Sequence, residues 1–385
     1  MRPSDFTDKA PGRLVETVKR DGMAFVPDKL PPDIPYSESL VSKLSEADVA
    51  LANLNASART LPNPEILVRP FLVREAVDSS KIEGTQTTYS GLFLFEAATP
   101  SARQAADPDV RVVGNYLSAL RYGIGRAVNL PVSRRLICEV HTKLMAGYNE
   151  ARTRPGQIRS DQVLIGSRNA TPTSARFVPP PHTFLNDLIS DFERFANARA
   201  VRPLLVTCAL LHYQFEAIHP FWDGNGRVGR LLISLTLCAE GRLFSPILYL
   251  SSYFERHRRE YYDALLRVST HGDWQSWLEF FLEGVRTQAQ DATDRILKLQ
   301  LLREEYRGRL SQRPRGTVSN MRLIDMLFET TFASVPMVRK RLNLSAPSGK
   351  ECIMRLEQAG ILIKYQRIGN THFWVAQEII DVINR

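Results

Sequence analysis

The stretch that decides the fold is HPFWDGNGRVGR, residues 219–230. Its GNGRVG part fits the G-x-G-x-x-G pattern of dinucleotide-binding proteins, but that fingerprint requires a preceding strand and a βαβ unit. Residues 204–218, LLVTCALLHYQFEAI, have a helical pattern instead, and no parallel strand follows. We therefore reject a nicotinamide site. A Walker-type nucleotide site is excluded as well, because the sequence has no G-x-x-x-x-G-K-[ST] stretch.

A helix, a tight turn and a second helix remain as the interpretation of this stretch. Residues 223–226 supply the turn, because glycine permits backbone angles that other residues avoid. The second helix is expected to begin near Arg227, and free N–H groups at a helix start attract an anion. Arg227 and Arg230 lie three positions apart on the first helical turn. Their two guanidinium groups and the helix start together predict a polyphosphate site.

Two neighbouring side chains add chemistry to this predicted site. Asp223 is placed to hold a divalent cation that bridges phosphates, and His219 could act as a general base toward an incoming hydroxyl. The stretch contains no serine or cysteine nucleophile, so the attacking group should come from a second substrate. A lone histidine is more often structural, and basic residues at a helix start usually face solvent. Arginines are disfavoured at a helix start, however, unless they serve an anion.

The composition is that of an ordinary soluble globular protein. Of the 385 residues, 44% are hydrophobic and 24% are charged, with a formal net charge of +9. We find no long apolar run and no apolar signal-peptide core, so we expect a cytoplasmic protein without a membrane span. The four cysteines lie far apart, which favours buried thiols over disulfides or a zinc site.

The first three quarters of the chain are mainly helical in pattern. Residues 1–36 are polar and interrupted by prolines, and we interpret them as an extended arm. Residues 162–182 hold two short β-type runs around a turn-rich centre, which predicts a hairpin closed by prolines. Apolar residues at helical spacing predict helices at residues 37–55, 72–83, 110–126, 133–146, 184–197, 203–217, 231–239, 253–268 and 274–285.

A more basic module is predicted at the C-terminal end. Residues 301–385 contain 14 Lys and Arg against 8 Asp and Glu, so they carry +6 of the net charge of +9. Residues 303–315 are charged, end in QRPRG and are interpreted as a linker. Three short helices and two strands around a Gly-Asn turn then follow, which is the layout of a winged helix-turn-helix. The helices are expected at residues 321–329, 334–342 and 346–359, and the strands within residues 360–376.

Such a module has two alternative uses. Basic side chains on its last helix and on its wing could contact DNA phosphates; these are Lys350, Arg355, Lys364 and Arg367. Winged helices also serve in protein docking, and this one could equally form a homodimer. The charge excess alone does not decide between these uses.

Residues 219–230 resemble the motif of the Fic family of adenylyltransferases, H-P-F-x-[D/E]-G-N-G-R-x-x-R, and match every fixed position. Other stretches, ARFVPPPH, LYLSSYF and WLEFFLEGV, are similar to the same subfamily over about residues 30–290. The resemblance implies a mainly α fold: a Fic-type helical bundle with a β-hairpin flap, followed by the winged helix. The implied domains are an N-terminal arm and helical region at 1–105, a Fic core at 106–300 and the winged helix at 316–385.

The resemblance also implies a reaction, in which AMP passes from ATP to a serine, threonine or tyrosine hydroxyl of a target protein. His219 would deprotonate the hydroxyl, and Asp223 would bind Mg²⁺ or Mn²⁺. The α- and β-phosphates would be cradled by Gly224, Asn225, Gly226 and Arg227, while Arg230 would pair with the γ-phosphate. The target would dock on the 162–182 flap by strand pairing. Tyr253 is a candidate wall of the adenine pocket.

A second informative stretch is SSKIEGTQTT, residues 79–88. Ser79 and Glu83 lie four positions apart on one helical face, and Gly84 can end the helix. The three residues fit the family's inhibitory pattern [S/T]-x-x-x-E-[G/N], which implies an inhibitory helix at about residues 72–84. By this resemblance Glu83 would take Arg230 away from the γ-phosphate. Without the resemblance, Glu83 would be interpreted as a solvated helix charge.

Other functions stay open at this point. The chain could be a nucleotide-sensing, DNA-binding regulator that transfers nothing, although the presence of both His219 and Asp223 favours an enzyme. Within the enzyme class, removal of AMP from targets and transfer of another nucleotide or phospho-group remain alternatives.

Overall fold

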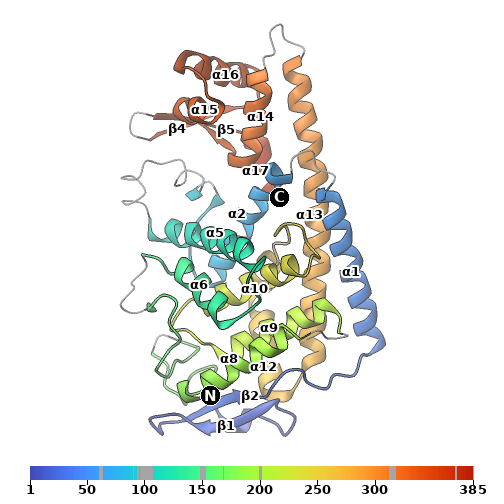
Figure 1. Cartoon of the computed structure of the whole chain (residues 1–385), viewed down its shortest axis with the longest axis vertical. Coiled ribbons are helices and arrows are strands. Elements are labelled where there is room, and N and C mark those ends of the chain that lie inside the picture. The colour runs from blue at the N-terminus through green and yellow to red at the C-terminus, as the bar shows by residue number, and fades with distance from the viewer. Residues whose placement is uncertain are drawn as a thin grey trace.

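The computed structural model describes residues 1–59, 64–89, 91–92, 95, 107–147, 153–167, 169–198, 202–311, 318–368 and 371–384. The fold is mainly helical, as predicted, with few strands. One long helix, α13 (Trp274–Ser311), runs along most of the molecule (Figure 1). The C-terminal elements lie at one end of this helix, and an N-terminal β-hairpin lies at the other end.

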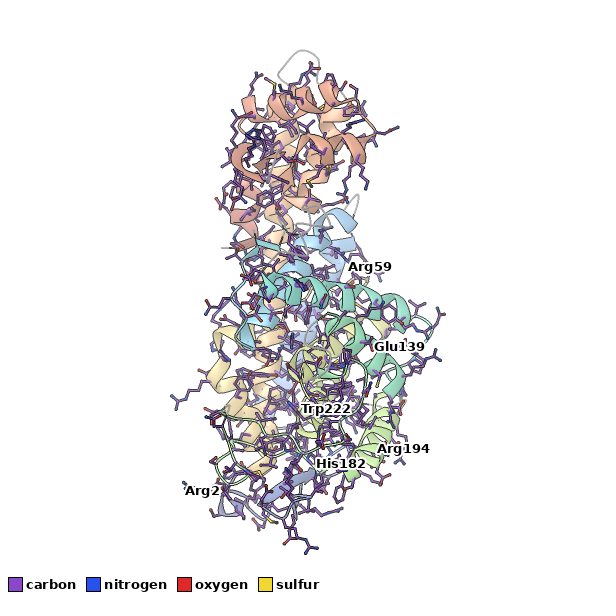
Figure 2. The ribbon with its side chains drawn as sticks, turned by 90° about the vertical axis from the view of Figure 1, so that its left-hand side faces the viewer. Arg2, Arg59, Glu139, His182, Arg194 and Trp222 are labelled. Atoms are coloured by element: carbon purple, nitrogen blue, oxygen red, sulfur yellow. The ribbon has the colours of Figure 1, made fainter. Side chains whose placement is uncertain are left out.

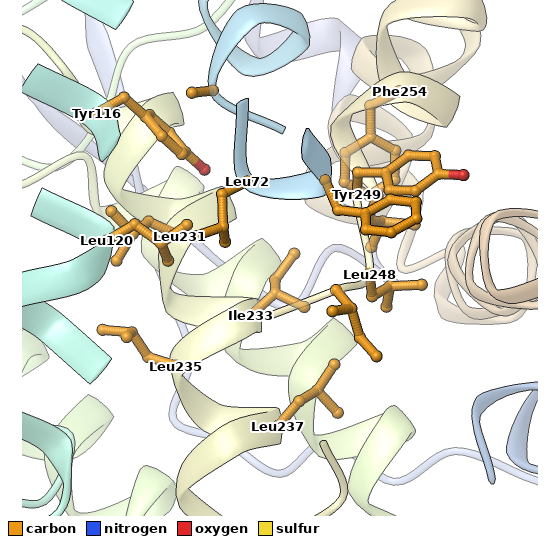
Figure 3. Close-up of a cluster of buried hydrophobic side chains, with 14 of the residues drawn as sticks. Leu72, Tyr116, Leu120, Leu231, Ile233, Leu235, Leu237, Leu248, Tyr249 and Phe254 are labelled. Atoms are coloured by element: carbon orange, nitrogen blue, oxygen red, sulfur yellow. The ribbon is translucent and has the colours of Figure 1, made fainter. Parts of the chain in front are cut away.

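Two buried helices occupy the centre of the larger part. They are α9 (Leu204–Ile218) and α10 (Asn225–Ala239), and they pack against one another. Around them lie α2 (Pro64–Ile82), α5 (Pro108–Ala127), α6 (Arg134–Leu144), α8 (Leu185–Ala196), α11 (Ser251–Arg256) and α12 (Arg258–His271). Figure 3 shows apolar side chains of α10 among those of α2 and α5. A Cβ at Gly123 of α5 would come within 2.9 Å of Leu235, so glycine permits this close helix contact.

The N-terminal segment is not the extended arm that its prolines and polar residues suggest. It forms two antiparallel strands, β1 (Gly12–Glu16) and β2 (Met23–Pro27). Phe25 of β2 is fully buried, and its ring lies 5.9 Å from the ring of Phe177. Its main-chain N–H also donates to the carbonyl of Val178, at 2.9 Å. The strands are thus stabilised by a distant part of the chain, which a local pattern cannot reveal.

The segment 303–315 is also different from the prediction of a linker. Helix α13 continues to Ser311 and packs along α1 (Glu38–Arg59), while residues 312–317 lie outside the described part. Tyr306 and Leu310, one helical turn apart, are buried. The charges that suggested a linker lie on the other faces, where Arg309 pairs with Glu305 at 2.7 Å. A short stretch of amphipathic helix with a highly charged face resembles a linker in composition, which is why the sequence pattern predicted one.

The C-terminal elements follow the predicted order. They are α14 (Val318–Thr330), β3 (Phe332–Ala333), α15 (Val335–Leu342), α16 (Ala346–Gln358), β4 (Ile363–Ile368), β5 (Thr371–Val375) and the unpredicted α17 (Gln377–Asn384). The three strands form an antiparallel sheet of order β3-β5-β4. Assignment to the winged-helix class stays a prediction. Of the proposed DNA-contacting residues, Lys350 is exposed, whereas Arg355 and Lys364 have acidic partners.

The predicted 162–182 hairpin is present in reduced form. Ile165 and Phe177 form one isolated antiparallel bridge, with N–H to O distances of 2.9 and 3.1 Å in the two directions. The described residues on either side do not form regular strands. The run of three prolines, residues 179–181, removes the N–H donors that a longer ladder would need.

None of the described helices combines the length and the apolar character that crossing a membrane requires. All four cysteines are free thiols; Cys208 and Cys352 are buried, and Cys138 and Cys238 are half-buried. The cytoplasmic location stays a prediction.

A buried carboxyl group at the contact of α2 and α11 predicts how stability depends on pH. Glu75 accepts hydrogen bonds from the main-chain N–H and the hydroxyl of Ser251 and from the Tyr116 hydroxyl. Burial raises the pKa of Glu75 to about 7 from its ordinary 4.5. The folded protein therefore holds this proton more tightly than the unfolded chain does. Stability contributed by the protonated group is present below about pH 4.5 and is lost as pH rises toward about 7.

Glu75→Gln should remove this loss, because the amide keeps the shape of the side chain and cannot ionise. We expect the free energy of unfolding at about pH 8 to rise by at most about 3 kcal/mol, with little change at about pH 4.5. Urea unfolding of both proteins across this pH range measures the difference. Parallel stability curves for the two proteins would contradict the prediction.

Candidate active site

The motif of residues 219–230 joins α9 to α10 through a tight loop. His219 ends α9 in the left-handed conformation, with φ 50° and ψ 62°. Gly224, with φ 78°, precedes α10, which begins at Asn225, two residues earlier than expected. The free N–H groups of the helix start therefore lie inside the motif. Figure 2 places Trp222, one of the variable positions of this motif, in the part of the molecule remote from the C-terminal elements.

The amide side chain of Asn225 closes the loop. Asn225 accepts a hydrogen bond from the Phe221 N–H and donates one to the Phe221 carbonyl, both at 2.9 Å. Both polar groups of this buried side chain are thus used inside the loop.

His141 of α6 supports the same loop, a role that no sequence pattern indicated. Its ring stacks on Phe221, with centroids 3.7 Å apart. Nδ1 accepts from the N–H of Gly156 at 2.8 Å, so Nε2 carries the proton and donates to the Asp223 carbonyl at 3.0 Å. Burial lowers the pKa of His141 to about 4, which keeps the ring neutral. A single histidine in a helical pattern gives no sequence signal for this role.

The structure brings Glu83, just beyond the end of α2, into contact with Arg230 of α10. Nη2 of Arg230 donates to Oε1 of Glu83 at 2.7 Å and to the carbonyl of Ser79 at 2.9 Å. Nε donates to the Ser79 hydroxyl, also at 2.9 Å. The Arg230 side chain is 1% exposed and that of Glu83 is 35% exposed. Glu83 and Arg230, the two side chains expected to pair, are thus in contact, and Ser79 binds the same guanidinium.

The charges of this pair stabilise one another. Burial alone would raise the pKa of Glu83, but the nearby Arg230 guanidinium outweighs it and lowers that pKa. Burial alone would likewise lower the pKa of Arg230, but the nearby Glu83 carboxylate outweighs burial and raises that pKa. Both groups are thus charged at neutral pH. Gly84, with φ 95°, turns the chain away directly after Glu83.

Gly226 explains how the carboxylate reaches the helix start. A Cβ at this position would collide with Oε1 of Glu83 and would lie 2.9 Å from Nη1 of Arg230. Glycine therefore leaves space for an anionic group beside the first turn of α10. Glu83 fills this space in the structure, and a phosphate group has the same requirements of charge and hydrogen bonding.

Arg227, in the first turn of α10, contacts Asp223 of the loop. The Arg227 side chain is 7% exposed, and its Nη2 donates to Oδ1 of Asp223 at 3.3 Å. Its buried Nε has no hydrogen-bond partner among the described residues. A buried donor without an acceptor is uncommon and suits a site that takes an anionic ligand.

A divalent cation would find one protein ligand here. Asp223 is 48% exposed and accepts from the Gly224 N–H through Oδ1, at 2.6 Å. The described residues hold no group of three or more His, Cys, Asp or Glu that could bind a metal ion. One carboxylate fits Mg²⁺, which commonly uses one or two carboxylates together with substrate phosphates.

A cavity of about 600 Å³ opens beside the motif. Its walls include His219, Glu83, Asp223, Gly226 and Arg230. The 162–182 segment contributes Leu164, Ile165, Gly166, Arg176 and Phe177, and α12 contributes Arg258, Tyr262, Leu265, Leu266 and Ser269. A volume of this size with mixed apolar and charged walls suits a small-molecule ligand.

Tyr253 is not among the described residues that line this cavity, and its place in an adenine pocket stays a prediction. Its ring packs 5.1 Å from that of Phe280 of α13 and 4.5 Å from that of His257. The short helix α11 turns this side chain toward α13 instead of the motif. The tyrosines on the cavity wall are Tyr213 and Tyr262, and no sequence pattern pointed to either.

The protonation state of His219 follows from its surroundings. Burial lowers its pKa to about 4, and the positive charge of Arg159 lowers it further. The ring is therefore neutral at neutral pH. Nδ1 lies 3.3 Å from the carbonyl of Glu216 and acts as the donor there, which leaves Nε2 free to accept a proton. Glu216 also lines the cavity, and burial raises the pKa of its carboxyl group to about 8.

Comparison with known proteins agrees with this picture. The model of the Fic/DOC family N-terminal domain matches residues 41–125, and the Fic/DOC family model matches residues 131–237. Protein adenylyltransferase Fic of Aedes aegypti is 30% identical over 168 residues, which are 43% of this chain and 28% of that protein. A probable protein adenylyltransferase of Aquifex aeolicus is 32% identical over 134 residues, or 35% of this chain and 36% of that protein. The chain thus matches about a third of the length of these relatives.

Two solved structures share the fold. A Fic family protein from Desulfovibrio desulfuricans superposes with a TM-score of 0.56 at 19% identity, over 90% of this chain and 98% of that one. Fic-1 from C. elegans gives 0.52 at 20% identity, over 68% and 74% of the two chains. The two family models match neighbouring parts of the chain, and the second contains the helix–loop–helix motif, so the chain belongs to the Fic/DOC family.

Proposed function

We propose that the chain is a protein adenylyltransferase that moves AMP from ATP to a hydroxyl side chain of a target protein, and that Glu83 restrains it. The observation that carries the proposal is the placement of one carboxylate on Arg230 and against Gly226, at the start of α10. This place combines a buried guanidinium with free helix N–H groups, so it suits a phosphate group. Neutral His219 lies on the wall of the same cavity.

In the proposed reaction, the target hydroxyl oxygen forms a bond with the α-phosphorus, and the bond between the α-phosphorus and the bridging oxygen to the β-phosphorus breaks. Pyrophosphate leaves with the bonding electrons, and the hydroxyl proton passes to Nε2 of His219. Arg227 and Arg230 would neutralise charge on the phosphates, which matters more than covalent chemistry in such transfers. Asp223 would hold Mg²⁺ or Mn²⁺, which neutralises phosphate charge when bound.

The target protein would dock beside the bridge between Ile165 and Phe177. Both residues line the cavity, and the described residues around them leave main-chain groups outside regular strands. An extended target segment could pair with this edge and bring its hydroxyl toward His219.

Transfer of label from ATP tests the function. The purified chain, its Glu83→Gly variant and the double variant with His219→Ala are incubated with Mg²⁺ and ATP labelled at the α- or the γ-phosphate, together with a cell extract as a source of targets. We expect protein-bound label from α-labelled ATP alone, strongest in the Glu83 variant and at least about 10²-fold weaker in the double variant. Label from γ-labelled ATP would indicate phosphate transfer. No label from either ATP in the Glu83 variant would refute adenylyl transfer, including self-modification.

A further inference from the structure

Arg159 is a buried arginine between the motif and the segment that carries the Ile165–Phe177 bridge. It is 2% exposed, and its guanidinium donates to main-chain carbonyls alone within the described part of the chain. The acceptors are the carbonyls of His219 at 2.8 Å, Ile218 at 3.3 Å, Asp161 at 2.8 Å and Pro180 at 2.6 Å. Its own N–H donates to the carbonyl of Pro220 at 2.9 Å.

These bonds hold an uncommon backbone conformation in place. His219 has positive φ, which costs energy for a residue other than glycine and persists where the surroundings stabilise it. Arg159 binds the carbonyls on both sides of the His219 α-carbon, since it contacts both Ile218 and His219. The same guanidinium holds Pro180, at the far end of the 162–182 segment.

We propose that Arg159 is a positioning residue, which fixes the imidazole of His219 relative to the segment where the target hydroxyl docks. This inference rests on the proposed function. Its charge adds a second effect, since an uncompensated guanidinium beside His219 disfavours a second positive charge on the ring. The other charged groups that face the ring are Glu83 from the end of α2 and, on the cavity wall, Asp223 and Arg230. Glu216 on the same wall is titratable, and burial raises its pKa to about 8.

Two substitutions in the Glu83→Gly background separate these effects. Arg159→Lys keeps the charge and loses the planar fork of donors, whereas Arg159→Met loses both. Both variants should transfer AMP about tenfold more slowly or worse, because small displacements of reacting groups are costly. In Arg159→Met alone, the pKa of His219 should rise, so that the acid limb of the pH–rate profile moves to higher pH.

NMR titration of the His219 imidazole in the folded variants measures the same pKa without any turnover. Unchanged rates in both variants would overturn the positioning role. An unshifted titration and acid limb in Arg159→Met would overturn the effect of the Arg159 charge on His219. A thermal melt shows whether each variant folds. If Arg159→Met does not fold, the rate of Arg159→Lys tests the positioning role. If the Glu83→Gly parent itself transfers no AMP, the proposed function fails, while the titration still tests the contact between Arg159 and His219.

A different observation links the C-terminal module to the inhibitory segment. Arg74 of α2 is buried and donates to the carbonyl of Ile383, in the last turn of α17, at 2.8 Å. Arg295 of α13, also buried, donates to the carbonyls of Ile383, at 3.1 Å, and Val382. Carbonyls at a helix end lack partners within the helix, and cations there are favourable. Figure 1 shows α17 beside α2 and α13.

Arg74 lies on α2, the helix that positions Glu83. Ser79, which binds Arg230, follows it by little more than one helical turn, and Glu83 comes directly after the helix ends. Helix α14 also packs on α2. We infer that docking of α17 holds α2 in place, so that release of α17 weakens the hold of Glu83 on Arg230. This inference, too, rests on the proposed function.

Arg295→Met in the full chain tests the link, because Arg295 holds α17 from α13 without belonging to α2. We expect Arg295→Met to raise AMP transfer about fivefold or more over the unsubstituted chain. Added to Glu83→Gly, the same substitution should give no rise above Glu83→Gly alone. Arg286→Met is the matched control, since Arg286 lies on the same helix and pairs with Glu283 and Glu46 at a distance from α17. Equal rates for Arg295→Met and the control, beside an active Glu83→Gly variant, would refute the link. An inactive Glu83→Gly variant would instead refute the proposed function.

Discussion

Glu83→Gly should raise AMP transfer by about ten- to a hundredfold, the equivalent of about 1.5–3 kcal/mol. In the structure, Glu83 occupies the guanidinium of Arg230 and the space beside Gly226. ATP would have to displace this carboxylate or bind with its phosphates shifted. Glycine removes the competitor and leaves Arg230 to the nucleotide. The measurement is the initial rate of label transfer from α-labelled ATP, together with the ATP affinity by calorimetry, which should increase.

Two further variants serve as a partial substitution and as a control for Glu83→Gly. Ser79→Ala removes the hydroxyl that accepts from Nε of Arg230 but leaves the Ser79 carbonyl and Glu83 in place, so a smaller increase is expected. Glu240→Gly is the matched control, because Glu240 is an exposed glutamate just beyond the other end of α10. A Glu83→Gly variant that transfers AMP no faster than the Glu240→Gly control would remove the case for restraint by Glu83.

His219→Ala in the Glu83→Gly background should lower AMP transfer by about 10²- to 10⁴-fold, the usual contribution of a general base. Loss of the imidazole leaves the target hydroxyl without a proton acceptor, while Arg227, Arg230 and the start of α10 remain. ATP binding should therefore stay within about threefold of that of the parent, a difference of less than 1 kcal/mol. This split between rate and affinity distinguishes a lost base from a collapsed cavity.

His257→Ala provides the comparison for this second variant. His257 lies between α11 and α12, pairs with Glu260 and is not among the described residues of the cavity wall. Its replacement should leave the rate unchanged. A His219→Ala variant that keeps more than about a tenth of the parent rate would show that another group, such as Glu216 on the same wall, takes the proton.

The sequence by itself determined the features that depend on neighbouring residues. The glycines of residues 219–230 and the apolar periodicity on either side predict a helix, a loop and a helix, because backbone freedom and helical spacing are local properties. The same holds for Glu83 at the end of a helix and for the order of the C-terminal elements. The family resemblance was available from the same twelve residues.

Only the tertiary structure decided which distant groups meet. Glu83 reaches Arg230 across 147 positions of the chain, and no spacing rule measures such a contact. The presence of Tyr213 and Tyr262 on the cavity wall and the support of the loop by His141 depend on how helices rotate when they pack. The N-terminal strands and the full length of α13 were missed for a related reason. Polar segments adopt regular structure here because remote apolar side chains cover one of their faces, and that burial belongs to the folded chain as a whole.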